Sequence, residues 1–169
     1  MSNSTSQSPP PSAEVMAELR IKMLSEPEAG FQAGAASSMP RVHRVLMDWP
    51  IGSYTATILA SAVGDASIYT TSTFGVLGGI GHESVRAAAG LFVKAAEAHL
   101  DTAKLTKDFS YPPQGRVRFY MVSVDGTRMV EADEESLHAG TDSYSDLWFL
   151  GQQVMAELRT VVQNVDKGR

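Results

Sequence analysis

The chain has 169 residues and a formal net charge of −5 at pH 7, with 14 lysines and arginines against 19 aspartates and glutamates. This length is typical of a single domain with a sizeable core. The acidic balance argues against a protein that binds nucleic acid or anionic membranes. Because the sequence has no cysteine, it excludes disulfide frameworks, thiolate metal sites and cysteine nucleophiles.

The N-terminus lacks the charged start and apolar run of a secretory signal. The apolar segment at residues 56–63 is too short to span a membrane. We therefore expect a cytoplasmic protein without membrane association.

Three segments precede the main body. Residues 1–11 are rich in serine and proline, which predicts a disordered tail. Residues 12–25 predict a helix that Ser12 caps, with an apolar stripe that contains Met16, Leu19 and Met23. Residues 26–40 are small and show no periodicity, which predicts a flexible linker. The helix could therefore sit away from the main body and serve as an arm for oligomerisation or docking.

Residues 41–165 predict a single α+β domain. The segments 42–49, 54–63 and 66–74 predict three strands of an antiparallel meander, although the apolar spacing of the first also permits a helix. Gly64 would supply the positive φ of the turn between the second and third strands.

Two helices and a hairpin follow. Helical periodicity predicts a helix over 83–100 and a long amphipathic helix over 145–165, where residues 143–146 resemble a capping box. Between the helices, residues 116–124 and 127–133 flank an Asp-Gly turn and predict a β-hairpin. The expected sheet is antiparallel and has about five strands.

The strand-to-helix junction from residue 75 to residue 86 is the main candidate binding segment. Its glycines match a dinucleotide-binding fingerprint only in part, because Ser84 replaces the third glycine and hairpins surround it. The exposed amides of a helix N-terminus can bind an anion, and the contributing residues would be Gly75, Gly78, Gly79, Gly81, His82, Glu83 and Arg86. The same glycines could instead serve only a sharp turn and close packing of the helix.

Other chemistry-bearing residues have simpler interpretations. Glu135 and His138 have a metal-binding spacing, but a metal site would need a second such pair. We therefore interpret them, with Asp133 and Glu134, as solvated charges. Asp48, an acid between apolar neighbours, is interpreted as capping the turn that follows it. A hydrolase built from Asp48 and a histidine is the alternative for that residue.

The pattern of residues 54–165 resembles the roadblock/LC7 and wider profilin-like group. The matching features are the hairpin TATILASAVGDASIYTTSTFG, the helix from residue 83, the hairpin RVRFYMVSVDGTRMV and the closing helix from residue 145. The resemblance implies a dimer-forming scaffold that engages small GTPases or other regulators. It transfers no functional residue to this chain.

The sequence as a whole favours a non-enzymatic interaction or regulatory domain, expected to be a homodimer with a protein partner and without cofactor or metal. Its contact surfaces would be the first helix and part of the last helix, whose second apolar stripe contains Trp148, Met155 and Val162. The alternative is a sensor that binds a nucleotide or another small anion at residues 75–86.

Overall fold

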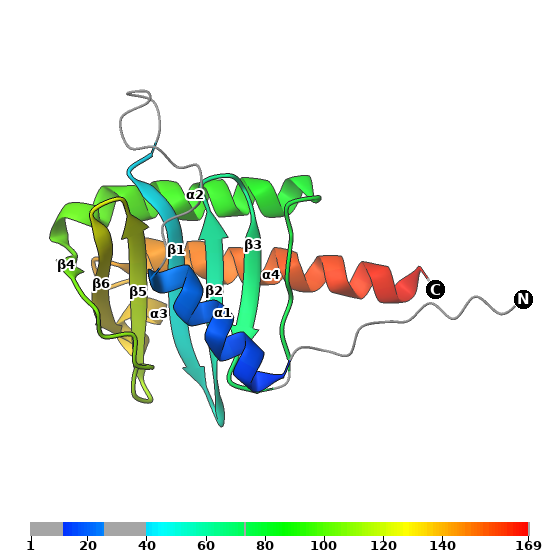
Figure 1. Ribbon diagram of the computed structural model, residues 1–169, viewed down its shortest axis with the longest axis horizontal. Coiled ribbons are helices and arrows are strands. Elements are labelled where there is room, and N and C mark those ends of the chain that lie inside the picture. Colours follow the sequence, from blue (N-terminus) through cyan, green and yellow to red (C-terminus); the bar gives the residue numbers. More distant parts are fainter. Residues whose placement is uncertain (1–11, 26–39, 73, 169) are drawn as a thin grey trace, which may run out of the picture.

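The computed structural model describes residues 12–25, 40–72 and 74–168. The predicted tail at 1–11 and all of the predicted linker except residue 40 lie outside these ranges. Within them the chain has an α+β fold with one six-stranded antiparallel sheet (Figure 1). The elements in chain order are α1 (Ala13–Ser25), β1 (Val42–Ile51), β2 (Tyr54–Ser61), β3 (Ala66–Thr70), α2 (Glu83–His99), the 3₁₀ turn η1 (Leu100–Thr102), β4 (Lys104–Leu105), β5 (Arg116–Ser123), β6 (Gly126–Asp133), α3 (Glu134–Ala139) and α4 (Ser145–Lys167).

The strands lie in the order β3-β2-β1-β5-β6-β4. The first three form the predicted meander, and β5 and β6 form the predicted hairpin. The hairpin joins the meander through antiparallel pairing of β5 with β1, which places β1 in the middle of the sheet. The sheet has one strand more than expected, because β4 is only two residues long and such a short segment shows no periodicity.

The strand β1 is covered on both faces. Val45 and Met47 point into the core under α2 and α4, whereas Leu46 belongs to a second cluster with residues of α1. Figure 1 shows α2 and α4 behind the sheet and α1 in front of it. Because successive side chains of a strand point to opposite faces, burial on both faces requires apolar residues at both parities. This is why the spacing of 42–49 also permitted a helix.

The helix α4 packs closely on the sheet. A Cβ atom added at Gly151 would lie 2.8 Å from the Sδ atom of Met47 and 3.3 Å from Phe92. Trp148 and Met155 are only 3% and 8% exposed, so the expectation that their stripe is a free contact surface is wrong. The helix lies against α2, α3 and the sheet together, which requires a wide apolar face.

The ends of the C-terminal helices differ from the prediction. The capping box at 143–146 does not form, because Tyr144 occupies the N-cap position of α4 without a side-chain bond, and Asp146 instead binds His99 of α2 at 2.9 Å. The short helix α3 was not predicted. Asp133 caps it by accepting a hydrogen bond from the Ser136 N–H at 3.0 Å, and Gly140 ends it with a φ of +75°.

The helix α1 packs on its own sheet rather than standing apart. Its side chains at Met16 and Leu24 are buried against the front face. None of the helices in the described ranges is long and apolar enough to cross a membrane.

Candidate functional site

A cavity of about 680 Å³ opens where β1, β6, α3 and α4 meet. This volume is within the range of small-molecule binding sites. Both tryptophans of the chain lie in its wall, and we call it the tryptophan cavity. Its lining residues are Trp49, Gly115, Asp133, Glu134, Glu135, His138, Trp148, Phe149 and Gln152.

Aromatic rings form one wall of the cavity. Trp49 lies near the end of β1 and Trp148 lies in the first turn of α4, and their rings meet edge to face with centroids 5.0 Å apart. Phe149 is 50% exposed beside them. Such rings present an electron-rich face that attracts cations.

Carboxylates form another part of the lining, because β6 runs directly into α3 through three successive acids. Glu134 accepts a hydrogen bond from Trp49 Nε1 at 2.8 Å. The Ser136 backbone N–H and hydroxyl lower the pKa of Asp133, which keeps this group charged at neutral pH. Glu135 and His138 are exposed. The interpretation of all four side chains as solvated charges is therefore wrong for Asp133 and Glu134, which are partly buried and bonded.

The negative charge of this part of the lining is offset only in part, by the charge of Arg116 outside the lining, which helps to lower the pKa of Asp133. None of the lining residues in the described structure is a lysine or an arginine. Arg116 pairs with Asp133 in the strand register, but its Nε donates to Glu131 at 3.1 Å. No group of three acidic or histidine side chains that could hold a metal ion occurs within the described ranges.

Gln152, one of the lining residues, contains a buried polar atom without a partner in the described structure. Its Nε2 atom is buried and has no hydrogen-bond partner among the described residues. A buried amide donor without a partner has a free-energy cost of about 1–3 kcal/mol, and an acceptor supplied by a ligand would remove it.

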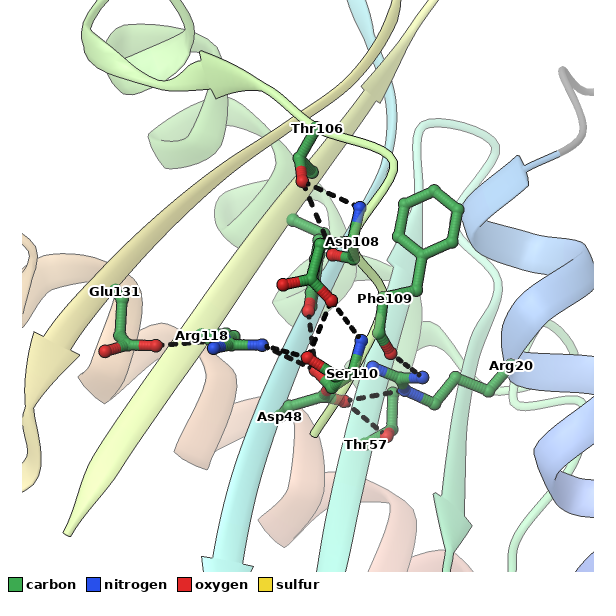
Figure 2. Close-up of polar contacts among 10 residues, drawn as sticks. Arg20, Asp48, Thr57, Thr106, Asp108, Phe109, Ser110, Arg118 and Glu131 are labelled. Carbon is green, nitrogen blue, oxygen red and sulfur yellow. Dashed lines mark hydrogen bonds and ion pairs between the residues drawn. The ribbon is translucent and has the colours of Figure 1, made fainter. Parts of the chain in front are cut away.

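A second polar constellation lies on the other face of the sheet, beneath α1. The strand register places Thr57, Asp48, Arg118 and Glu131 side by side across β2, β1, β5 and β6. Asp48 is completely buried. Figure 2 shows Arg20 reaching from α1 to the carboxylate of Asp48, which it binds through Nε at 3.1 Å and through Nη2. The hydroxyl of Thr57 donates to the same carboxylate at 2.5 Å.

Arg20 is surrounded by partners. It also donates to the carbonyl oxygen of Phe109 at 2.7 Å, and its guanidinium lies 4.2 Å from the centroid of the Tyr111 ring. Burial alone would lower the pKa of Arg20, but the hydrogen bond and charge of Asp48 outweigh it and raise this pKa. Burial raises the pKa of Asp48 against the opposing bonds from Arg20 and Thr57. The interpretation of Asp48 as a turn cap is therefore wrong.

The loop that supplies the Phe109 carbonyl is itself held by an ion pair. Arg118 binds Glu131 at 2.6 Å and donates to the Ser110 carbonyl at 2.7 Å (Figure 2). The hydrogen bond from Arg118 lowers the pKa of Glu131. Glu131 thus anchors the loop that completes the Arg20 site.

We expect the stability of the protein to fall on acidification from about pH 6 to about pH 3, partly through Glu131. Because the pKa of Glu131 is lowered in the folded state, its contribution is present above the unfolded value of about 4.3 and is lost as the pH falls through the folded value. Urea unfolding across this pH range should show a shallower dependence for Glu131→Gln than for wild type. Glu18→Gln, at an exposed position on α1, should follow wild type, and equal slopes for all three proteins would contradict the assignment.

The glycine junction brings its predicted residues together and gives several of them structural roles. Val76 pairs with Ile68, and the Gly79 N–H donates to the Ala66 carbonyl at 3.1 Å, so the junction covers the edge of β3. Gly78 has a φ of +75°, and a Cβ added at Gly79 would overlap neighbouring side chains.

The charged groups of the junction lie at the start of α2. His82 occupies the N-cap position without a side-chain bond, and it is exposed, as are Gly81 and Glu83. Arg86 donates to the Ile80 carbonyl at 2.6 Å, so its guanidinium supports the junction itself. Anion binding by Gly75, His82 and their neighbours stays a prediction.

Known proteins offer no guide to these sites. No family model and no curated protein matches the sequence, and no solved structure matches the fold. The function must therefore be inferred from the geometry of the sites.

Proposed function

We propose that the protein is a non-enzymatic interaction domain that binds a lysine or arginine side chain of a protein partner in the tryptophan cavity. The observation that carries the proposal is the combination of an aromatic wall with three acidic side chains and no lysine or arginine in the described lining. A cation over an aromatic ring gains about 0.5–2 kcal/mol, depending on how far it is desolvated.

Two features favour a peptide over a simple cation. The Nε2 atom of Gln152 has no hydrogen-bond partner among the described residues; a peptide carbonyl that reached it would be an acceptor, whereas an ammonium ion has only donors. The half-exposed ring of Phe149 leaves the cavity open to a side chain that stays attached to a larger molecule. Within the described lining there is no serine, threonine or lysine, so the cavity offers no hydroxyl or amine nucleophile of these types.

The resemblance to roadblock-like domains and the expected self-association are in keeping with an interaction role, and both stay predictions. The tryptophan cavity adds a chemical specificity that the resemblance does not imply.

Intrinsic fluorescence tests the proposal directly, because both tryptophans of the chain line the cavity. Titration with Nα-acetyl-lysine methylamide or its arginine analogue should give a saturable change in emission, with a dissociation constant of about 1 mM, or about −4 kcal/mol. The neutral norleucine analogue is the matched control and should give no saturable change. Added salt should weaken the binding of both cations.

Substitutions identify the residues responsible. Glu134→Gln keeps an acceptor for Trp49 Nε1 but removes the charge, and it should weaken cation binding several-fold. Phe149→Ala should do the same, whereas Phe74→Ala, at a similarly exposed phenylalanine outside the cavity, should bind like wild type. Equal binding of the norleucine analogue, or no effect of either cavity substitution, would reject the proposal.

A further inference from the structure

The contact between α1 and the sheet depends on one stripe of the helix. Met16, Arg20 and Leu24 follow one another at four-residue intervals and are 1%, 2% and 0% exposed. Residues at this spacing share one helix face. The helix face that contacts the sheet thus has an aliphatic residue, an arginine and a second aliphatic residue in this order.

The sheet presents three parallel rows of side chains to this stripe, which follow from the strand register. A polar row contains Asp48 and binds Arg20. The next row is apolar and packs with Met16 and Leu24; it contains Leu59, Leu46, Tyr120 and Met129. The third row contains Arg44 and Thr127.

The third row forms hydrogen bonds with the C-terminal end of α1. Arg44 donates to the Met23 carbonyl at 2.7 Å, and the Thr127 hydroxyl donates to the Leu24 carbonyl at 2.5 Å. The last carbonyls of a helix have no partner inside it and carry partial negative charge. The groove therefore recognises a helix terminus as well as a side-chain pattern.

The central ion pair is better explained by selectivity than by stability. Apolar residues of similar volume often replace a buried ion pair without loss of stability, whereas the loss of one partner leaves an uncompensated charge. A helix without a cation at the central position would leave the buried carboxylate of Asp48 unpaired, which is unfavourable. A cavity of about 470 Å³, lined by Leu24, Leu105 and Phe109 among others, also lies at the C-terminal end of α1.

We propose that this face of the sheet is a receptor for an amphipathic helix of a partner protein, and that α1 occupies it as a built-in competitor. The partner helix carries an arginine with aliphatic residues four positions before and after it, and it ends at Arg44 and Thr127. The helix α1 contributes no strand to the sheet, so its departure from the groove would leave the strand pairing unchanged.

A labelled peptide with the sequence of residues 12–25 serves as the probe, with the full-length chain as the receptor. Fluorescence anisotropy should show at least tenfold tighter binding to an Arg20→Ala chain than to wild type, because the substitution weakens the competitor and leaves Asp48 in place. An Arg20→Ala peptide should bind the same chain at least tenfold more weakly. An Arg41→Ala chain is the control for loss of an exposed ion pair and should behave like wild type.

If the Arg20→Ala chain fails to fold, amide hydrogen exchange of the wild-type chain with added peptide provides a second test. Excess peptide should accelerate the exchange of the α1 amides and leave those of α2 unchanged. No acceleration together with no binding to either chain would show that α1 is a permanent part of the fold. Binding that does not depend on the arginine of the peptide would equally overturn the proposal.

Discussion

Replacing Asp48 by alanine should lower the free energy of unfolding by about 3–5 kcal/mol, since it leaves the buried guanidinium of Arg20 without its counter-charge. The Phe109 carbonyl and the Tyr111 ring remain beside Arg20, but neither carries a negative charge. The helix α1 must then either keep an unpaired cation beneath it or leave the groove and expose Met16 and Leu24.

Urea unfolding measures this loss. Asp101→Ala removes the acid of an exposed ion pair with Arg41 and should leave the free energy of unfolding nearly unchanged, because solvent screens such pairs. The double variant Arg20→Met/Asp48→Leu should lose less stability than Asp48→Ala, since it removes both charges and keeps the volume filled. A loss for Asp48→Ala as small as that for Asp101→Ala would contradict the burial of the pair.

Gly79→Ala should cost about 1–3 kcal/mol of stability through overpacking. The added methyl group would lie 2.5 Å from Cγ1 of Val85 and 2.8 Å from Cδ2 of Leu158. Val85 lies in the first turn of α2 and Leu158 belongs to α4, so relief requires a shift of one helix or the other.

Gly81→Ala is the matched control two residues away. Apart from Gly81 itself and its two chain neighbours, no atom of the described structure lies within 4 Å of a Cβ added at Gly81, so this change should be neutral or slightly stabilising. Thermal or urea unfolding of both variants distinguishes a packing role from a shared ligand-binding role. Equal losses for the two variants would show that close contact with Val85 and Leu158 is not the reason for glycine at position 79.

The order of elements could be predicted because each long element carries its own period. The segment 54–63 alternates as a strand, and the Asp125-Gly126 pair marks the hairpin between β5 and β6. The short elements β4 and α3 carry too few residues for a period. The apparent capping box at 143–146 was wrong because Asp146 has a competing partner in His99, which is remote in sequence.

The candidate sites could not be predicted for the same reason. Arg20 and Asp48 lie 28 residues apart. No local sequence pattern predicts that a charged residue of the first helix faces a strand of the sheet. Trp49 and Trp148 meet only because β1 ends where α4 begins. Single residues such as Gln152 have no spacing signal at all, so their position in a cavity follows only from the fold.

Asp48 and Trp49 are neighbours on β1 and point to opposite faces of the sheet. The first holds the helix on the front face, and the second forms a wall of the cavity on the back face. A shift of the β1 backbone at Trp49 would therefore also move Asp48. If occupation of one face alters the affinity of the other, thermodynamic reciprocity requires the influence to be equal in both directions. The strand β1 alone would then couple the groove under α1 to the tryptophan cavity.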